Sequence, residues 1–250
     1  MKPASPQTDG ERRERSRLAP EGAPFVAGAL ALAIPGAVAA LLLDRWIVWA
    51  GAGVLAGLAA STVAFFRDPA REGPRGPELV LAGADGRVLG TERVERAPYL
   101  DAPGLRVSVF LSLLDVHVNR HPISGSVEWR EERSGGCEPA WRPSAARHNA
   151  SITLGVRRDD GRGVAVRQVV GLVARRLVNH AREGDRVEQG ARMGVMRFGS
   201  RLDLFLPEDA EVLVERGDRT TAGVTVIARL ARTPEGAPAA AGEGGDRGGA

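Results

Sequence analysis

The segment Met196-Arg197-Phe198-Gly199-Ser200-Arg201-Leu202-Asp203 joins two expected strands, 193–198 and 202–205, and it guides the interpretation of the whole chain. Glycine has no side chain to block an approaching group, and its backbone tolerates strained geometry. The hydroxyl of Ser200 could therefore attack the carbonyl carbon of Gly199 and turn the amide into an ester. Most Gly-Ser pairs are only turns, so the surrounding sequence has to decide between the two interpretations.

From Val80 onward, short runs rich in Val, Leu and Ile alternate with Gly, Pro and Asp, and no long helical periodicity appears. This pattern predicts a mainly β fold, a compact barrel or sandwich. Two segments, 184–190 and 215–218, resemble the hairpin turns of lipoyl-type sandwich barrels and form a weak internal repeat. The expected strands are 86–94, 105–111, 125–130, 151–157, 164–170, 174–178, 193–198, 202–205, 210–214 and 224–230.

Two uncharged runs, 24–43 and 46–66, precede the β-rich region and are separated by Asp44 and Arg45. Each has about 20 residues, which as a helix at about 1.5 Å per residue spans roughly 30 Å of hydrocarbon. One continuous span would place Asp44 and Arg45 at mid-membrane, at about 2.5 to 3.5 kcal/mol each. The runs therefore predict a transmembrane helical hairpin, and two buried helices of a soluble domain are the alternative. Small residues that favour close packing recur in the second run: Gly51, Gly53, Gly57 and Ala60.

These patterns divide the chain into four segments: a flexible tail over 1–23, the hairpin over 24–66, a β-rich domain over 67–231 and a disordered tail over 232–250. Arginines lie before the hairpin and follow it at Arg67 and Arg71. Positive residues favour the cytoplasmic side of a membrane. We therefore expect the protein at the cell membrane, with the β-rich domain on the cytoplasmic side.

The composition limits the partners. The chain has 34 basic and 31 acidic residues, a net charge of +3, and Lys2 as its only lysine. This balance suits an anionic membrane surface better than a nucleic-acid groove, which needs a basic patch with stacking aromatics. The single cysteine, Cys137, excludes an internal disulfide. The four histidines show no metal-ligand spacing, so we expect neither a metal nor a nucleic-acid partner.

Six blocks of sequence, in order between residues 65 and 229, resemble the short-chain branch of the phosphatidylserine decarboxylases. They are Phe65-Phe66-Arg67-Asp68-Pro69, Ala84-Asp85-Gly86-Arg87-Val88, Phe110-Leu111-Ser112-Leu113-Leu114-Asp115-Val116-His117-Val118-Asn119-Arg120, Pro122-Ile123-Ser124-Gly125, Gly171-Leu172-Val173-Ala174-Arg175-Arg176, and Gly184-Asp185-Arg186-Val187 running into Arg197-Phe198-Gly199-Ser200-Arg201.

The resemblance implies a membrane-anchored enzyme, a zymogen that makes its own cofactor. Attack of Ser200 on Gly199, followed by β-elimination, would leave a β chain ending at 199 and an α chain that starts with a pyruvoyl group at 200. The two would remain a non-covalent pair. The pyruvoyl carbonyl would form a Schiff base with the amine of phosphatidylserine, accept the electrons released with carbon dioxide and yield phosphatidylethanolamine. A pyridoxal enzyme is disfavoured by the residues themselves, because the only lysine, Lys2, lies in the tail.

A base must take the Ser200 proton. If 115–119 is extended, Asp115, His117 and Asn119 share one face, and a histidine near its ordinary pKa serves as general acid or base at neutral pH. We therefore take His117 as the working histidine. Relatives in the long branch use an Asp-His-Ser set, whose aspartate matches Asp85. Their triad histidine aligns with Arg120 here, and an Asp-Gly turn remains the other interpretation of Asp85.

Substrate binding is assigned to Arg120 and Asp115. The guanidinium of Arg120 could hold a phosphate or carboxylate through a bidentate fork, and a surface salt bridge is the alternative for this residue. An ether-linked lipid would undergo the same head-group chemistry as phosphatidylserine. A third interpretation is a membrane-anchored barrel-sandwich adaptor without catalysis, in which Gly199-Ser200 is only a turn.

Overall fold

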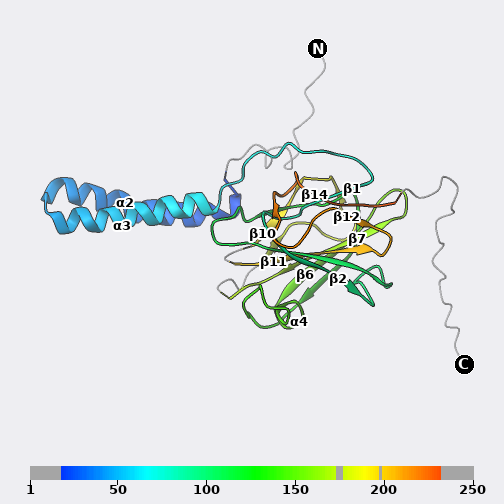
Figure 1. The fold of residues 1–250 in the computed structure, drawn as a ribbon. Coiled ribbons are helices and arrows are strands. Elements are labelled where there is room, and N and C mark those ends of the chain that lie inside the picture. The colour runs from blue at the N-terminus through cyan, green and yellow to red at the C-terminus, as the bar shows by residue number, and fades with distance from the viewer. Residues whose placement is uncertain (1–17, 173–176, 197–198, 232–250) are drawn as a thin grey trace, which may run out of the picture.

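The computed structural model describes residues 18–172, 177–196 and 199–231. As predicted, it is mainly β, with two long apolar helices ahead of the β-rich part (Figure 1). The helical elements are η1 (Pro20–Gly22), α2 (Ala23–Leu43), α3 (Trp46–Phe65) and α4 (Ala145–His148). The strands are β1 (Leu79–Leu81), β2 (Gly86–Val94), β3 (Gly104–Phe110), β4 (Val118–Arg120), β5 (Gly125–Arg133), β6 (Ser151–Arg157), β7 (Gly163–Val169), β8 (Leu177–Asn179), β9 (Arg186–Val187), β10 (Arg192–Met196), β11 (Arg201–Pro207), β12 (Glu211–Val212), β13 (Arg219–Thr220) and β14 (Val226–Arg229).

The longer strands lie where the sequence pattern places them, but β1, β4, β9 and β13 were not predicted. These strands have only two or three residues each, too few to show an alternating pattern. The expected strands 174–178 and 193–198 both extend into segments outside the described residues. So do most of the expected N-terminal tail, residues 1–17, and nearly all of the C-terminal one, residues 232–250.

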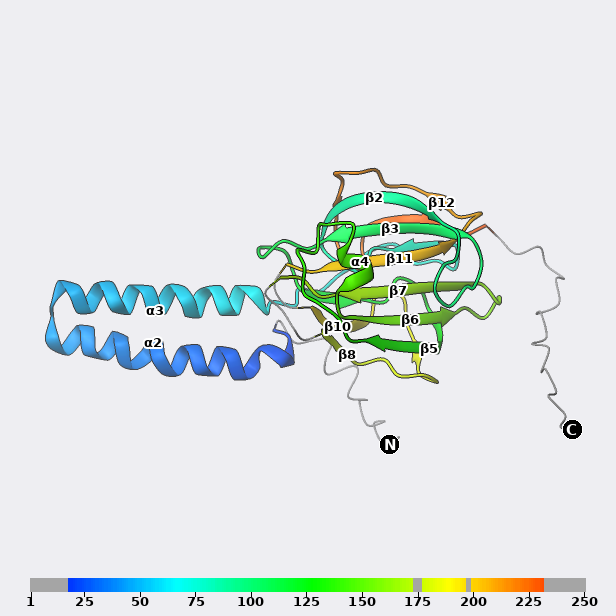
Figure 2. The same cartoon turned by 90° about the horizontal axis from the view of Figure 1, so that it is seen from below.

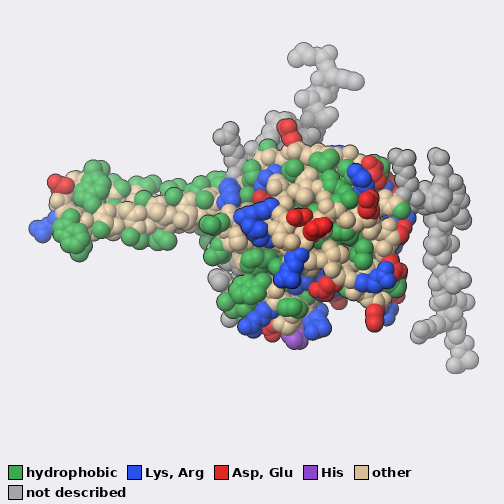
Figure 3. All heavy atoms as spheres, viewed as in Figure 1, with side chains coloured by type: hydrophobic (Ala, Val, Ile, Leu, Met, Phe, Trp, Pro, Cys, Tyr) green, Lys and Arg blue, Asp and Glu red, His purple; other side chains and the backbone are tan. Residues whose placement is uncertain are grey.

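The helices α2 and α3 form a hairpin that projects from one end of the β-rich domain (Figure 2). Asp44 ends α2 in a left-handed conformation, with φ 40° and its N–H on the carbonyl of Ala40 at 3.1 Å. Both helices have the length and composition to cross a membrane. Figure 3 shows apolar side chains along the hairpin and charged ones at its far tip. Its large exposed side chains include Leu32, Ile34, Leu41, Leu42, Trp46, Ile47, Val54 and Leu58.

The two helices are in close contact through small residues, but these are not the glycines of the second run that the sequence pattern indicated. A Cβ added at Gly51, Gly53 or Gly57 would meet no atom within 4 Å, so these glycines do not face α2. A Cβ on Gly36 of α2 would instead lie 2.9 Å from Leu55 of α3. Small side chains are buried on the same faces, at Ala40, Ala52 and Ala59. Each helix is turned so that these small residues face the other helix, because small side chains let the two backbones approach each other closely.

The β-rich domain is built from two halves with the same topology. Its large sheet has eight strands in the order β13-β2-β3-β11-β7-β6-β5-β9, and two three-stranded sheets, β1-β14-β12 and β4-β10-β8, accompany it. The strands β1 to β3 and β11 to β14 form one half, and β4 to β10 form the other. The second half is therefore inserted between β3 and β11 of the first, and the chain crosses between the halves twice, over 111–117 and between Met196 and Arg201.

Hydrogen bonds confirm the internal repeat predicted from the two turns. In one turn the N–H of Gly184 donates to Val127, and the N–H of Val127 donates to Asp185, at 2.8 and 2.9 Å. In the other the N–H of Gly217 donates to Val88, and the N–H of Val88 donates to Asp218, both at 2.9 Å. Both turns require a glycine because φ is +89° at Gly184 and +99° at Gly217. The lipoyl-type turns thus hold equivalent strands in both halves.

The core lies between the large sheet and the two small ones. Alternate residues of β11 point into it, and Leu202, Leu204 and Leu206 are all fully buried. Buried valines of β3 and β7, the neighbours of β11, pack beside them. The central strand that follows Ser200 is therefore fixed by packing as well as by its hydrogen bonds.

Replacement of Gly125 by Ala is expected to destabilise the domain by about 1 to 3 kcal/mol, because φ there is +156° and the new Cβ would lie 2.2 Å from the carbonyl oxygen of Arg157. Thermal unfolding of the detergent-solubilised protein measures the change. Gly53→Ala is the matched control, since its Cβ meets nothing and alanine favours the helix. Equal melting temperatures for the two variants would contradict the assigned close contact.

Candidate functional site

The candidate site lies where the chain crosses twice between the two halves of the domain. The N–H of Leu111 donates to the carbonyl of Ser200 at 2.9 Å, and the N–H of Met196 donates to the carbonyl of His117 at 3.1 Å. The two ends of segment 111–117 are therefore hydrogen-bonded to the two ends of segment 196–200. The fold thus brings together the two elements that carry Ser200 and His117, although they are far apart in sequence.

The Gly199-Ser200 bond lies between β10 of a small sheet and β11 of the large sheet. Gly199 has φ +66°, in the left-handed region that favours glycine, and a Cβ there would meet no atom within 4 Å. The conformation rather than crowding therefore accounts for the glycine. Ser200 is fully buried. A buried hydroxyl next to a carbonyl in this turn is shielded from bulk water.

His117 is buried, with 1% of its surface exposed, and its ring packs 4.1 Å from that of Phe65, centroid to centroid. Its Nδ1 lies 2.9 Å from the carbonyl oxygen of Asp115. A carbonyl only accepts, so Nδ1 carries the proton and a neutral ring has its lone pair on Nε2. Among the described residues Nε2 has no hydrogen-bond partner. Burial lowers the pKa of His117 to about 4.

The expectation of a near-ordinary pKa at His117 is therefore wrong, because the ring is buried against an aromatic side chain. The lowered pKa decides which proton-transfer role the ring can take at neutral pH. A histidine that is neutral at pH 7 with a bare Nε2 is a proton acceptor rather than a donor.

Asp115 does not share an extended face with His117, contrary to expectation. Its carboxylate closes a tight turn: Oδ2 accepts from the N–H and the hydroxyl of Ser112 at 2.8 and 2.7 Å, and Oδ1 accepts from Arg219 at 2.8 Å. Burial acts to raise the pKa of Asp115, but these hydrogen bonds outweigh it and the pKa is lowered. The carboxylate therefore holds the shape of the 112–115 turn, and the extended β4 begins only at Val118.

Asp85 pairs with an arginine and a backbone amide instead of a histidine. Its Oδ2 lies 2.7 Å from Arg71, and its Oδ1 accepts from the N–H of Ala222 at 2.8 Å. Nδ1 of His117 donates to the carbonyl of Asp115, and Nε2 has no hydrogen-bond partner in the described chain, so Asp85 does not orient that ring in this state. Asp85 and His117 are not joined as a triad would require.

Arg120 belongs to a buried row of charges at the base of the hairpin. Its guanidinium donates to Asp68 at 2.8 Å and to the carbonyls of Pro69 and Gly190 at 3.2 and 3.0 Å. Arg192 approaches the other oxygen of Asp68 at 3.9 Å and also pairs with Glu21, which lies in η1. Burial raises the pKa of Asp68, although Arg120 and Arg192 oppose this. The row ties the start of the hairpin to β4 and β10.

A buried chain of amides beside the site was missed by sequence reasoning. The side chain of Gln168 on β7 donates to Asn119 at 2.8 Å and accepts from Asn179 at 2.8 Å. Asn119 and Asn179 lie on either side of Gly194, which they both pair with. The amide nitrogen of Asn119 has no partner among the described residues. Each amide alone is an ordinary strand residue, so only the pairing of the strands reveals the chain.

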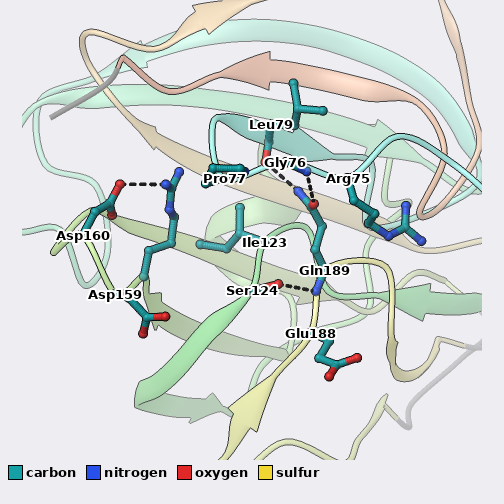
Figure 4. A pocket seen from close by; sticks show the side chains of 11 residues that line it. Arg75, Gly76, Pro77, Leu79, Ile123, Ser124, Asp159, Asp160, Glu188 and Gln189 are labelled. Atoms are coloured by element: carbon teal, nitrogen blue, oxygen red, sulfur yellow. Dashed lines mark hydrogen bonds and ion pairs between the residues drawn. The ribbon is translucent and has the colours of Figure 1, made fainter.

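A pocket of about 630 Å³ lies beside the 122–125 turn, in the half of the domain formed by β4 to β10, and is lined by other side chains than those of the candidate site (Figure 4). Here Ser124 accepts from the N–H of Gln189 at 2.9 Å, as Asp85 accepts from Ala222 in the other half. The side chain of Gln189 fills one wall, bonded to Gly76 and Leu79. The pocket therefore occupies the same place in its half of the domain as the Asp85 region does in the other half. Its described lining contains no histidine and does not include Ser200, so it lacks both the candidate nucleophile and the candidate base.

Some sequence candidates lie outside the described residues. These are Arg175 and Arg176, which the resemblance includes, and Arg197 and Phe198, which directly precede Gly199.

Comparison with known proteins gives a consistent result. The sequence model of a family described as "Phosphatidylserine decarboxylase" matches residues 58–228. A protein named "Phosphatidylserine decarboxylase proenzyme" from Symbiobacterium thermophilum is 45% identical over 216 residues, covering 86% of this chain and 97% of that protein. One of the same name from Saccharopolyspora erythraea is 47% identical over 217 residues, with 85% and 88% covered. A third, from Pelobacter propionicus, is 39% identical over 219 residues, with 88% and 99% covered.

The protein should lose stability as the pH falls from about 6.5 to about 4. Burial lowers the pKa of both His117 and His121 to about 4, so in this window the unfolded chain takes up protons that the folded chain does not. The shift from 6.5 to about 4 corresponds to roughly 3 kcal/mol for each histidine. Melting temperatures of the detergent-solubilised protein across this range measure the loss.

His117→Gln should show a shallower decline across this window than the parent, and His117→Gln combined with His121→Gln a shallower one still. Identical slopes for all three proteins would mean that the two rings are not buried in the neutral form.

Proposed function

Because the chain belongs to the phosphatidylserine decarboxylase family, we propose that it cuts itself between Gly199 and Ser200 and then decarboxylates phosphatidylserine to phosphatidylethanolamine. The observation that carries the first part is that Nε2 of the buried, neutral His117 has no hydrogen-bond partner among the described residues, and that His117 lies on the segment hydrogen-bonded to the Gly199-Ser200 turn. The names of the relatives support the second part. Their designation as proenzymes supports processing before activity.

The first step needs a base, and the geometry supports His117 in this role. Its Nε2 takes the hydroxyl proton of Ser200 as Oγ bonds to the carbonyl carbon of Gly199 and the bond to the Ser200 nitrogen breaks. That nitrogen receives the proton, and the result is an ester. The carbonyl of Asp115 stabilises the protonated ring, because it already accepts from Nδ1 at 2.9 Å.

Elimination then removes the Cα proton of residue 200 and releases the carboxylate of Gly199. Addition of water and loss of ammonia leave a pyruvoyl group at the new N-terminus. The site fits such a group, since Ser200 is fully buried and its own carbonyl is held by the N–H of Leu111. The pyruvoyl carbonyl supplies the electron sink for decarboxylation. What this chain adds is a buried site, a neutral histidine and a strand, paired on both sides, that carries the group.

Both products of the cut are expected to stay together. β10 is held by β4 on one side and β8 on the other, and β11 is held by β3 and β7. The cut therefore breaks one bond between strands that are each fixed in their own sheets. This supports a non-covalent α/β pair as the active form.

The remaining assignments are also proposals. The apolar hairpin supports anchoring in the cell membrane, and the arginines at its base support a cytoplasmic position of the β-rich domain, next to an anionic surface. Asp115 acts through the 112–115 turn. Arg120, which pairs with Asp68, positions β4 rather than offering an open fork. Asp85 with Arg71 shapes the neighbouring loop.

Ser200→Ala is expected to abolish self-cleavage. The parent protein should run on a denaturing gel as two fragments, and the smaller one should have an N-terminus at position 200 that is blocked to sequencing, with a mass that fits a pyruvoyl group. The variant should remain one chain, inactive on phosphatidylserine with ester- or ether-linked chains. Ser134→Ala, at an exposed serine far along the sequence, is the control and should be cut normally.

An intact chain in the parent as well as in Ser200→Ala would favour the adaptor interpretation. An uncut parent that still releases carbon dioxide from the lipid would rule out the pyruvoyl route.

His117→Gln is expected to slow self-cleavage by about 10²- to 10⁴-fold, the usual contribution of a general base. The time course of the uncut band after synthesis at pH 7 measures the rate. His121→Gln is the matched control, because His121 is also buried and neutral but does not lie on the segment facing Ser200. Equal rates for the two variants would show that another group takes the proton.

A further inference from the structure

An apolar groove of about 480 Å³ opens where the helical hairpin meets the β-rich domain. One wall belongs to α2, α3 and the two residues after α3, and the other to the 112–115 turn. Its apolar lining is Phe25, Leu58, Phe65, Phe66, Leu113 and Leu114. The groove therefore continues the apolar surface of the two helices into the domain that carries Ser200.

The far wall is a rigid turn with two leucines at its tip. Ser112 and Asp115 close the turn with three hydrogen bonds, two to the carboxylate and one between the backbone groups at 3.1 Å. Leu113 and Leu114 are left 56% and 85% exposed. The turn thus exposes two adjacent leucines beside helices long enough to span a membrane. Exposed apolar side chains in such a place are suited to insert into the surface of a bilayer.

Arg67 joins the two walls at the inner end of the groove. Its guanidinium donates to the carbonyl of Ala64 on α3 and to that of Leu114 on the turn, both at 2.6 Å. Its charge is also close enough to His117 to contribute to the low pKa of that ring. Phe65, which lines the groove, packs against the same ring at 4.1 Å. The groove thus runs from the level of the helices to a cation beside the working histidine.

We infer that this groove holds one acyl chain of the phospholipid substrate, with Leu113 and Leu114 inserted in the leaflet and Arg67 facing the anionic phosphate. The inference rests on the proposed function and extends it by giving the position of the acyl chain of the substrate. Apolar walls that end in an arginine match a molecule with a hydrocarbon chain and a negative head group. A lipid held this way need not leave the membrane fully, because the groove is continuous with the surface of the helices.

The test compares two substrates in the full-length protein. Dipalmitoyl phosphatidylserine in phosphatidylcholine vesicles uses the groove, whereas dihexanoyl phosphatidylserine below its micelle concentration fills little of it. The variant Leu113→Asp with Leu114→Asp should raise KM for the long-chain lipid, lowering kcat/KM about tenfold or more, and change the short-chain value by less than about twofold. Ser61→Trp, which fills the groove from α3, should act in the same direction.

The denaturing gel should show normal self-cleavage in these variants. Leu213→Asp is the matched control, an exposed leucine away from the hairpin that should leave both substrates unaffected. An equal loss on both lipids, or no loss on the long-chain lipid, would overturn the groove assignment while the parent remains active. If the parent releases no carbon dioxide from either lipid, the proposed function fails, and the groove assignment with it.

Discussion

The pairing of β11 at the centre of the large sheet is the constraint on which the site depends. Seven residues of β11 pair with β3, and five of them also pair with β7. On the other side of the Gly199-Ser200 bond, β10 is fixed between β4 and β8 in a different sheet. The bond therefore lies between two strands that are each paired on both sides, and Gly199 has a left-handed conformation where the chain passes from one sheet to the other. Ser200 and the carbonyl of Gly199, the proposed nucleophile and its target, are positioned by the fold before any chemistry begins.

The same arrangement explains which parts of the structure could be predicted from sequence. Local patterns sufficed for the apolar hairpin, the longer strands and the two repeated turns, because each is encoded within a few neighbouring residues. The 112–115 turn was misjudged because Asp115 prefers the nearby donors of Ser112 to an extended strand. The low pKa of His117 depends on Phe65, and the partner of Arg120 is Asp68, about fifty residues away in each case. Contacts of that range follow from strand pairing and helix placement, which no local pattern contains.

The buried row of charges gives the hairpin a direct mechanical connection to the site. Glu21 lies at the beginning of the helices, and Asp68 follows their end, so both ends of the hairpin reach Arg192 and Arg120 on neighbouring strands. Burying such charges is costly unless each one is paired, so the row forms only in one arrangement of hairpin and domain. A backbone hydrogen bond between Ala19 and Phe66 at 2.7 Å closes the same base. The apolar hairpin is thereby held in one orientation relative to His117.

The insertion of one half of the domain into the other has a consequence for the lifetime of the mature molecule. After the cut, the smaller product would contain β11 to β14, whose sheet partners β1 to β3 belong to the larger product. Before the cut, folding is a unimolecular event, whereas afterwards reassembly requires two separate chains to meet and becomes second order in concentration. A matured molecule that opens would therefore rarely regain its structure, so its persistence is set by how slowly it unfolds rather than by its equilibrium stability. The pairing of β11 with strands on both sides is the feature that slows this unfolding.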